Sequence, residues 1–267
     1  MNIKKMSDLS EKVVFLTGAA GILGTQYATA LSNAGANVVL ADINYTRCKK
    51  MEIKLKKEFD VTPFSLKMDI SNKKSIDNGI SKVMKKFSKI DVLVNNAVFP
   101  ETQKERKIEF EKFPLELWNK IFAVNVTGVF LCNQKIGSIM VKQQKGSIIN
   151  ISSMYGIVAA DQRIYGESNL NSPVSYAASK GGIINLTRYL AAYWNKKNIR
   201  VNTLTLGGVQ DNSYQSKNFI KKYSEKTILG RMAKKDEYEG AMLFLLSDAS
   251  SYMTGSNLVI DGGWTAW

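Results

Sequence analysis

Histidine is absent from this chain of 267 residues, and cysteine occurs only twice. Without histidine there can be no histidine-dependent catalytic triad, and no metal site is expected because imidazole and thiolate are the usual ligands of transition metals. Cys48 lies in a predicted helix and Cys132 in an apolar run, so we expect both thiols to stay reduced. This cysteine usage fits a reducing compartment, most simply the cytoplasm.

Long apolar runs are also lacking. No uninterrupted apolar stretch approaches about 20 residues, so no membrane span is expected. Residues 1–12 are charged and contain no apolar core of the kind found in secretory signals, so no signal peptide is expected. Because the chain shows no repeat and no linker, and 45% of its residues are apolar, we expect residues 1–267 to form one large α/β domain.

Acidic residues are few relative to basic ones, since 23 Asp and Glu residues stand against 37 Lys and Arg residues and give a net charge of +14. Basic proteins attract nucleic acids, anionic membranes or anionic substrates. The lysines are spread over many predicted helices, however, where they are mixed with acidic residues. We therefore expect an ordinary solvated surface and no nucleic-acid partner, with attraction of an anionic substrate as the second interpretation.

What the chain does have is a glycine-rich turn after its first apolar run, in the stretch Val13–Gly24. The run is short and rich in β-branched residues, which predicts a buried strand, and helical spacing follows the turn. Gly18 permits a tight turn, Gly21 lets backbone N–H groups approach a pyrophosphate, and Gly24 lets the helix lie close to the strand. The spacing differs from the G-x-G-x-x-G pattern, so a flexible loop that binds nothing is the alternative.

The second predicted strand, Asn37–Asp42, ends in a carboxylate. In dinucleotide-binding folds, an acidic residue about 20 positions after the glycine turn accepts hydrogen bonds from the adenine ribose. Asp42 would repel the 2′-phosphate of NADP, and the nearest basic residue after it is Arg47. The sequence therefore favours NAD over NADP, and an ordinary acid at a strand end is the alternative.

Strands and helices alternate along the whole chain. The strands that we predict are 13–16, 37–42, 62–69, 90–94, 146–153, 199–204 and 258–260. This alternation predicts a single-domain Rossmann fold, which is a doubly wound parallel sheet of about seven strands with helices on both faces. Ligands bind beyond the carboxyl ends of such strands, where Asp69-Ile70, Asn95-Asn96-Ala97 and Gly207-Gly208 are found.

Four further segments carry expectations of their own. Residues 99–113 are polar and should loop over the surface, whereas residues 115–141 read as one long helix with Asn125 in its middle. The amide of that Asn must be satisfied, either within the core or by a functional water or backbone contact. Tyr176 and Lys180 are four residues apart in a predicted helix and therefore share one face of it. Residues 210–235 are polar and lysine-rich, as in a mobile lid.

Taken together, these features resemble the short-chain dehydrogenase/reductase family over essentially the whole chain. Each is weak alone, but all of them occur in order and after the expected strand or within the expected helix. The matching pieces are TGAAGILG at 17–24, Asp42, Asp69, NNA at 95–97, Asn125, the serine pair at 152–153, YAASK at 176–180 and DGG at 261–263.

The resemblance implies four catalytic residues. Tyr176 would be the acid/base, and Lys180 would lower the pKa of Tyr176 and bind the nicotinamide ribose. Ser153 would donate a hydrogen bond to the substrate oxygen, and Asn125 would hold a proton-relay water. A free tyrosine titrates near ~10, and a fixed ammonium together with the positively charged nicotinamide would bring the pKa of Tyr176 closer to the working pH.

The same resemblance implies the binding residues and a division of labour along the chain. The expected cofactor-binding residues are Gly18, Gly21, Ile22, Leu23, Gly24, Asp42, Ile43, Asp69, Ile70, Asn96, Ala97, Tyr176, Lys180, Gly207 and Val209. The expected substrate-binding residues are Ser153, Tyr155, Tyr165 and Gln210. Residues 10–150 would mainly bind the cofactor, and residues 151–235 would mainly carry catalysis and substrate binding.

Several positions depart from the usual family pattern. Ile22 stands where the second glycine is usual, Val98 follows NNA in place of glycine, and Leu206 precedes Gly207 in place of proline. We expect these changes to adjust loops without abolishing NAD binding. The spacing from Ser153 to Tyr176 is longer than in most members, which predicts an insertion over the substrate pocket.

Within the family, the chain resembles the oxidoreductases of bacterial surface-sugar pathways, of the flagellin modification protein A type. The cues are the AGILG turn, the YGES-type insertion and GGVQDN at 207–212. They imply a sugar or sugar-phosphate alcohol in nonulosonic (legionaminic-type) acid supply. The basic side chains of the lysine-rich segment would suit a phosphate, with a solvated helix as the alternative; they are Lys217, Lys221, Lys222, Lys226 and Arg231.

The sequence thus predicts an NAD(H)-dependent oxidoreductase that interconverts an alcohol and a ketone on a small, sugar-like substrate. One alternative is an NADPH-dependent 3-oxoacyl or small-ketone reductase, against which Asp42 and the polar insertion argue. The other is a non-catalytic, nucleotide-sensing Rossmann protein, against which the complete catalytic set argues. The family resemblance also implies a homo-oligomer, most simply a tetramer or a dimer, and no membrane partner.

Overall fold

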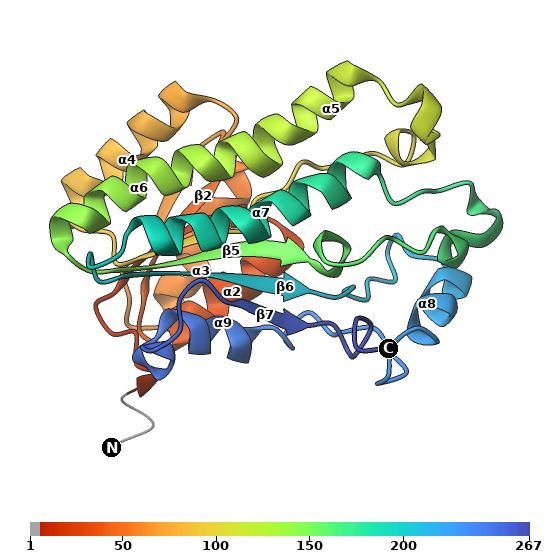
Figure 1. Cartoon of the computed structure of the whole chain (residues 1–267). Coiled ribbons are helices and arrows are strands. Elements are labelled where there is room, and N and C mark those ends of the chain that lie inside the picture. The colour runs from red at the N-terminus through yellow and green to blue at the C-terminus, as the bar shows by residue number, and fades with distance from the viewer. Residues whose placement is uncertain (1–5) are drawn as a thin grey trace.

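The computed structural model describes residues 6–267 and is built on one seven-stranded parallel sheet (Figure 1). The strands are β1 (Val13–Thr17), β2 (Asn37–Asp42), β3 (Phe64–Lys67), β4 (Val92–Asn95), β5 (Gly146–Ser153), β6 (Ile199–Leu206) and β7 (Asn257–Ile260). Their order across the sheet is β3-β2-β1-β4-β5-β6-β7. The predicted fold class is confirmed. The start of the N-terminal segment, for which no signal peptide is expected, lies outside the described residues.

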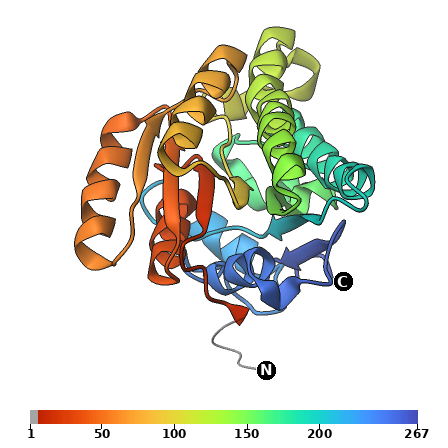
Figure 2. The same ribbon diagram turned by 90° about the vertical axis from the view of Figure 1, so that its left-hand side faces the viewer.

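Helices cover both faces of the sheet (Figure 2). One face is covered by α2 (Ile22–Asn33), α3 (Tyr45–Glu58) and α9 (Glu239–Leu246). The other is covered by α4 (Lys73–Phe87), α6 (Val129–Gln143) and α7 (Val174–Tyr193). Because both faces are buried, the strands are continuous apolar runs without alternation, as in β1, where all five residues are buried.

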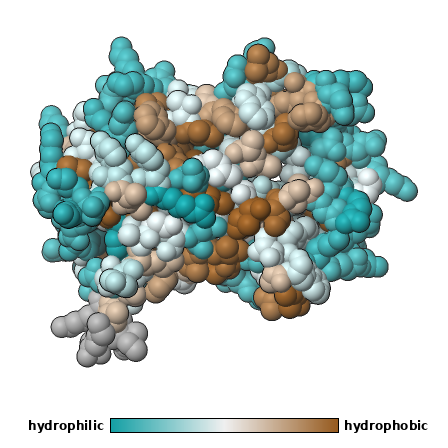
Figure 3. Space-filling view, viewed as in Figure 1, coloured by the Kyte–Doolittle hydropathy of each residue, from teal (hydrophilic) through white to brown (hydrophobic). Residues whose placement is uncertain are grey.

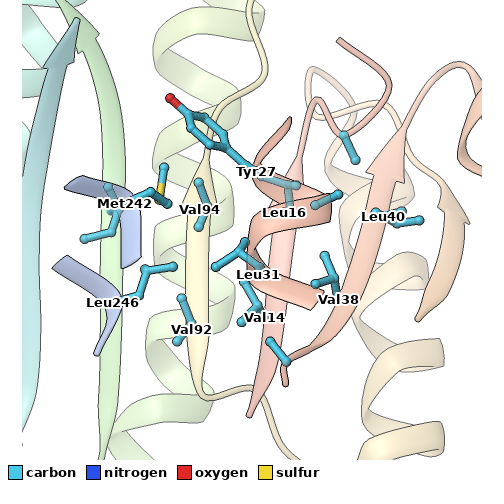
Figure 4. Close-up of a cluster of buried hydrophobic side chains, with 14 of the residues drawn as sticks. Val14, Leu16, Tyr27, Leu31, Val38, Leu40, Val92, Val94, Met242 and Leu246 are labelled. Atoms are coloured by element: carbon cyan, nitrogen blue, oxygen red, sulfur yellow. The ribbon is translucent and has the colours of Figure 1, made fainter. Parts of the chain in front are cut away.

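The apolar core forms where these helices meet the sheet. On the first face, side chains of α2 and α9 pack onto β1, β2 and β4 (Figure 4). Leu31 of α2, Val14 of β1 and Val92 of β4 are among its fully or almost fully buried members. This packing fixes the start of α2 against the end of β1, and therefore fixes the glycine turn between them.

Local signals in the sequence set most element boundaries. Asn44 and Asn72 cap α3 and α4, because their side chains accept hydrogen bonds from the backbone N–H groups of Arg47 and Ser75. The strand predicted at 62–69 is shorter in the structure, since only Phe64–Lys67 pairs with β2. It is the edge strand of the sheet and has only that one neighbour with which to form a ladder.

The long helix predicted at 115–141 is instead three segments in continuous succession. α5 (Leu115–Phe122) and α6 are joined by the π-helical segment η3 (Ala123–Gly128). Asn125 lies in this wider turn, and its side chain bonds to groups outside the helix. Single π-helical turns within α-helices are frequent at functional sites.

This helical stretch, Leu115–Gln143, is also the one stretch within residues 6–267 that is long and apolar enough to cross a membrane, with mean hydropathy 1.2. In the structure, Cys132, Ile136 and Met140 are fully buried in the core on the second face of the sheet. The stretch therefore serves as a core helix of the α/β domain.

The sheet reverses its order between β1 and β4, which are neighbours although three helical crossovers, through α2, α3 and α4, separate them in sequence. Chains leaving these two strands turn to opposite faces of the sheet. A crevice opens at their carboxyl ends, and ligands of doubly wound folds bind at this position.

Candidate active site

A cavity of about 1140 Å³ occupies that crevice and extends over the carboxyl ends of the central strands. One end is formed by the glycine turn and Asp42, and the other by Tyr165 and Tyr214. The predicted site residues that line it are Gly18, Gly21, Ile22, Leu23, Gly24, Asp42, Ile43, Asp69, Ile70, Asn96, Ala97, Ser153, Tyr155, Tyr165, Tyr176, Lys180, Gly207 and Val209. Asn125 and Gln210 do not line it.

The glycine turn has the shape of a phosphate cradle. Gly18 has a positive φ of 66°, and a Cβ atom on Gly24 would lie 2.1 Å from the carbonyl oxygen of Gly18. Gly21 caps α2 without any side-chain hydrogen bond, and the first turn contains no acidic residue. The backbone N–H groups of Ile22 and Leu23 are therefore left for a ligand, as a pyrophosphate requires. These residues fit a dinucleotide.

Asp42 is held at the rim of this cradle by two backbone groups. Its Oδ2 accepts a hydrogen bond from the N–H of Ala20 at 3.0 Å, and its Oδ1 accepts one from the N–H of Asn44 at 2.8 Å. Each carboxylate oxygen can accept a further hydrogen bond. Arg47 lines the same part of the cavity. The position suits the hydroxyl groups of a ribose.

Asn96 ties the ends of β1 and β4 together. Its side-chain amide donates to the carbonyl oxygens of Thr17 and Gly18, both at 3.1 Å. The hydroxyl of Thr17 in turn accepts from the N–H groups of Asn96 and Ala97. Because all the donors of the Asn96 side chain are engaged, this residue positions the turn. Asp69 similarly accepts from Ser71 while lining the cavity.

Ser153, Tyr176 and Lys180 meet on the cavity wall, at the end of β5 and the first turns of α7. The Ser153 hydroxyl is hydrogen-bonded to the phenol of Tyr176. The ammonium of Lys180 lies 5.6 Å from the ring centroid of Tyr176 and donates to the carbonyl oxygen of Ile151 at 2.9 Å. A hydroxyl pair beside a buried cation is an arrangement that can move a proton to or from a substrate oxygen.

Burial dominates the titration of this group. It raises the pKa of Tyr176, and the Ser153 hydrogen bond only partly offsets this. Burial also lowers the pKa of Lys180 to about 8. The expected lowering of the pKa of Tyr176 by Lys180 is therefore not seen in the protein alone, because desolvation raises that pKa more than the Ser153 hydrogen bond and the Arg106 charge lower it.

Asn125 lies beneath the cavity with 2% of its surface exposed. Its Oδ1 accepts from the N–H of Phe99 at 2.8 Å, and its Nδ2 donates to the hydroxyl of Ser179 at 3.3 Å. Ser179 donates to the carbonyl oxygen of Tyr176. Asn125 thus connects the chain after β4 to the first turns of α7.

The segment after β6 closes the cavity from below. Leu206 pairs with Ile260 in the sheet, so leucine continues the strand where proline is usual in the family pattern. Gly207 packs so tightly that a Cβ atom would lie 2.7 Å from Cα of Asp261. Val209 bridges to Ala233 and lines the cavity, whereas Gln210 is exposed and its side chain donates to Asn212.

Two segments far apart in sequence form a roof over the cavity. η5 (Gln162–Ser168), from the predicted insertion, packs on α8 (Lys217–Ser224), from the lysine-rich segment. Tyr165 stacks on Phe219 with ring centroids 5.3 Å apart. The basic side chains expected to suit a phosphate do not line the cavity; Lys226 pairs with Asp161, and Arg231 pairs with Glu237.

Two charged residues near Tyr176 were not singled out from the sequence. Arg106 lines the cavity and donates to the Tyr165 hydroxyl at 3.2 Å. Burial raises the pKa of Glu101 to about 7, and this carboxyl group raises the pKa of Tyr176. Arg106 and Glu101 both belong to the polar connection at 99–113. Its position after the carboxyl end of β4 was the one feature of the sequence that could have pointed to them as site residues.

Replacing Glu101 with glutamine should make stability less dependent on pH. The folded protein keeps a proton on Glu101 that the unfolded chain releases, so its stability falls as pH rises from about 4.5 to about 7. The Glu105 carboxylate also raises the pKa of Glu101, whereas the Arg106 charge lowers it. The charge of Glu101 in turn raises the pKa of Tyr176. The melting temperature of E101Q should therefore exceed that of the unsubstituted protein near about pH 8.

This difference should become small at about pH 4, where Glu101 is protonated in the folded protein and largely protonated in the unfolded chain. Thermal unfolding followed by circular dichroism at the two pH values measures it. Glu111→Gln is the matched control, since Glu111 is exposed and lies in the same connection. An equal difference at both pH values would contradict the burial of a titrating Glu101.

Within residues 6–267, no group of three or more His, Cys, Asp or Glu side chains is arranged to hold a metal ion. Cys48 and Cys132 are buried free thiols, and burial raises the pKa of each to about 12. Neither thiol lines the cavity. The chemistry available in the cavity is therefore that of its hydroxyl, ammonium, guanidinium and carboxyl groups.

Comparison with known protein families and sequences gives full-length matches. Residues 18–265 match the family described as Enoyl-(Acyl carrier protein) reductase. The flagellin modification protein A of Campylobacter coli is 33% identical over 96% of this chain and 99% of its own length. An NAD-dependent glycerol dehydrogenase of Listeria innocua is 34% identical over 97% and 95%. A 3-oxoacyl-(acyl-carrier-protein) reductase of Thermotoga maritima is 34% identical over 96% and 98%.

Solved structures match the fold just as completely. A short-chain dehydrogenase from Leptospira borgpetersenii with bound NAD⁺ has a TM-score of 0.84 and 33% identity, over 99% of this chain and 97% of that one. A gluconate 5-dehydrogenase from Burkholderia cenocepacia in complex with NADP and tartrate has a TM-score of 0.89 and 26% identity, over the whole of both chains. The two neighbours thus hold different forms of the dinucleotide.

Proposed function

Because the chain belongs to the short-chain dehydrogenase/reductase family and is an NAD(P)-dependent oxidoreductase, we propose that it interconverts an alcohol and a ketone with NAD(H) on a sugar or sugar phosphate. The observation that carries this proposal is the Ser153–Tyr176–Lys180 group on the wall of a cavity whose other end is the glycine cradle. A nucleotide-sensing protein without catalysis would have no use for such a group.

Each residue of the group has a part in proton transfer. The cofactor, when bound, supplies or accepts the hydride. Ser153 holds the substrate oxygen beside the phenol of Tyr176, which gives up or takes the proton. Lys180 places a positive charge close to that phenol and holds the nicotinamide ribose. Asn125 keeps the start of α7 aligned and takes part in the proton relay by holding a water molecule.

The choice of NAD(H) rests on Asp42. Its carboxylate is fixed by the N–H groups of Ala20 and Asn44, so it cannot swing away from a 2′-phosphate without losing both bonds. The NAD-dependent name of the Listeria relative and the NAD⁺ in the Leptospira structure support the same preference. Residues 10–150 would thus mainly bind NAD(H), and residues 151–235 would mainly carry catalysis and substrate binding.

The choice of a sugar-like substrate rests on polar groups in the roof and on the relatives. Tyr155 and Tyr165 line the cavity beside Arg106 and offer hydroxyl groups. The names of relatives include a flagellin modification protein and a glycerol dehydrogenase, and one structural neighbour is a gluconate 5-dehydrogenase. These support a polyhydroxylated substrate in surface-glycan biosynthesis. The buried free thiols are compatible with the cytoplasm.

An NADPH-dependent 3-oxoacyl or small-ketone reductase is the second candidate. Arg47 lines the cavity near Asp42, where a guanidinium could bind a 2′-phosphate. The Thermotoga relative is named as a 3-oxoacyl reductase. Oxidation of a panel of polyols, sugar phosphates and nucleotide sugars with NAD⁺, against reduction of acetoacetyl thioesters with NADPH, separates the two. Turnover of the thioesters alone would contradict our proposal.

We propose further that the protein is a homo-oligomer, most simply a tetramer. Apolar patches gather over the middle of the face on which α6 and α7 lie (Figures 1 and 3). Phe130 of α6 is 44% exposed, and Tyr189 and Tyr193 of α7 are 61% and 68% exposed. Large exposed apolar patches mark interaction surfaces.

Light scattering coupled to size exclusion measures this expectation. The mass should be about four times, or for a dimer about twice, the 29.7 kDa of one chain. Introducing a charge on this face, as in Tyr193→Glu at the end of α7, should shift the protein towards the monomer. A monomeric mass for the unsubstituted protein at micromolar concentration would contradict the proposal.

A further inference from the structure

Five aromatic side chains at the substrate end of the cavity form a closed circuit of contacts, which we call the aromatic belt; they are Tyr155, Tyr165, Phe219, Tyr223 and Trp264. The ring centroids of Tyr165 and Phe219 lie 5.3 Å apart, and those of Phe219 and Tyr223 lie 5.9 Å apart. The Trp264 ring centroid lies 4.6 Å from that of Tyr223 and 6.4 Å from that of Tyr155. A hydrogen bond between the hydroxyl groups of Tyr155 and Tyr165 closes the circuit.

The aromatic belt joins four segments that are separate in sequence. Tyr155 lies in the short helical turn after β5, and Tyr165 belongs to η5. Phe219 and Tyr223 belong to α8, and Trp264 follows β7. Aromatic pairs at these distances stabilise a packing arrangement beyond the area that they bury. The belt therefore holds both parts of the roof, η5 and α8, against the end of β5.

Tyr223 also fixes the belt to the backbone below the cavity. Its side chain is 3% exposed, and its hydroxyl accepts from the N–H of Gly208 and donates to the Sδ atom of Met154 at 3.4 Å. A Cβ atom on Gly208 would lie 2.6 Å from the Tyr223 ring, so the ring packs directly on the turn after β6. Gly208 and Met154 both line the cavity. A movement of α8 would therefore break contacts with two parts of the cavity wall.

Four members of the belt line the cavity, whereas Trp264 lies behind them and contacts Tyr155 and Tyr223. Its indole is 8% exposed. Protein interiors are close-packed, so a ring that is backed by another buried ring cannot retreat without opening a void or moving the chain. Trp264 thus fixes the position of the cavity wall without touching a ligand in the cavity.

Building on the proposed hydride-transfer function, we propose that the aromatic belt limits the size of the substrate, and that Trp264 is the positioning residue that sets this limit. A substrate of one sugar unit reaches Tyr176 with the wall in place. A second ring on the substrate would have to displace Tyr155 or Tyr165, which the belt holds. The enzyme would thus act on single sugar units in preference to disaccharides and nucleotide-linked sugars.

Pairs of probes that differ by one sugar ring measure this limit. Sorbitol and maltitol form one pair, and gluconate and lactobionate form the other. Isothermal titration of the full-length protein, with and without saturating NADH, gives the affinity for each probe. The variants are Trp264→Leu, which removes the indole, and Tyr223→Phe, which keeps the ring and removes its hydrogen bonds. The controls are Trp118→Leu, whose indole stacks on Phe122 in α5 outside the cavity, and Tyr252→Phe, whose side chain is exposed.

We expect the smaller member of at least one pair to bind about tenfold more tightly than the larger member in the unsubstituted protein. Trp264→Leu should bring the two affinities within about twofold of each other, because the wall can then retreat before the larger member. Tyr223→Phe should narrow the difference in the same direction, and both controls should keep it. A loss of stability alone would weaken both members equally, so the ratio of the two affinities separates a positioning role from a structural one.

Tryptic cleavage of α8 reports on the belt without any substrate. Lys217 and Lys221 are exposed on this helix, and a protease cuts a helix only where it opens locally. Both variants should be cleaved there about tenfold faster than the unsubstituted protein, because α8 loses contacts that hold it to the cavity wall. The two controls should keep the slow rate. Mass spectrometry of the fragments identifies the bonds that are cut.

Two results would overturn the proposal. One is the absence of any preference for the smaller probe in the unsubstituted protein, including a failure of all four probes to bind. The other is a preference, or a rate of tryptic cleavage, that neither variant changes. A failure of NADH to bind would instead contradict the proposed function, and the titrations without NADH and the cleavage rates would still decide on the belt.

Discussion

Replacing Tyr176 with phenylalanine is expected to reduce turnover by about 10³-fold or more while leaving NADH affinity within about twofold. The substitution removes the phenol that exchanges a proton with the substrate oxygen and retains the ring, which packs beside the Lys180 ammonium. The Ser153 hydroxyl would lose the phenol as a partner but would still accept from the N–H of Tyr155 and stay at the end of β5. The measurement is steady-state turnover of the best substrate found, together with NADH titration.

Tyr189→Phe is the matched control, because Tyr189 lies on the same helix and is 61% exposed. It removes a hydroxyl of the same kind without touching the cavity, so turnover should stay unchanged. Near-normal turnover in Tyr176→Phe would show that another group moves the proton. Loss of both turnover and NADH binding would point to a structural fault and would contradict the assigned role.

The second large effect is expected at Asp42. In Asp42→Asn the negative charge disappears, while an oxygen remains to accept a hydrogen bond from the N–H of Ala20 or Asn44. NADH should bind more weakly because its ribose loses a charged acceptor, and NADPH more tightly because a repulsion is removed. Together these changes should shift the ratio of the two dissociation constants by about 100-fold.

Parallel titrations of both cofactors measure this ratio. Asp60→Asn controls for the loss of one negative charge, since Asp60 is exposed and lies outside the cavity. An unchanged ratio of the NADH and NADPH dissociation constants in Asp42→Asn would mean that Asp42 does not bind the adenine ribose. The preference would then have to come from Arg47, the nearby cation in the cavity wall.

The sheet and the cofactor end of the cavity could be predicted because their signals are local. Buried parallel strands are continuous apolar runs, and the glycines and Asp42 follow such runs directly. In a doubly wound fold, all carboxyl ends of the strands lie on one side of the sheet, so residues far apart in sequence converge there without further information. The cofactor residues expected from the sequence accordingly line one cavity.

The substrate end could not be predicted in the same way, because its contacts join irregular segments. Arg106 lies in a polar connection, and only the fold places it against Tyr165 from an insertion almost sixty residues later in the chain. The π-helical turn at Asn125 likewise depends on its contacts with Phe99 and Ser179, which helical periodicity does not reveal.

The pKa of Tyr176 could not be predicted from the sequence either. A lysine one helical turn away suggested a lowered pKa for Tyr176, yet burial raises it in the protein alone. Burial also lowers the pKa of Lys180 to about 8, so the ammonium is itself destabilised by its surroundings. Spacing tells which groups meet, whereas the extent of desolvation depends on the finished fold.

The most direct test of the central claim is isothermal titration of the purified protein with NADH and NADPH in parallel. The account predicts a single site per chain that binds NADH at least about tenfold more tightly than NADPH, because Asp42 accepts from the ribose and repels the 2′-phosphate. Tighter binding of NADPH would overturn the assignment of Asp42 and favour the ketone reductase. Absence of binding for both cofactors would contradict the account as a whole.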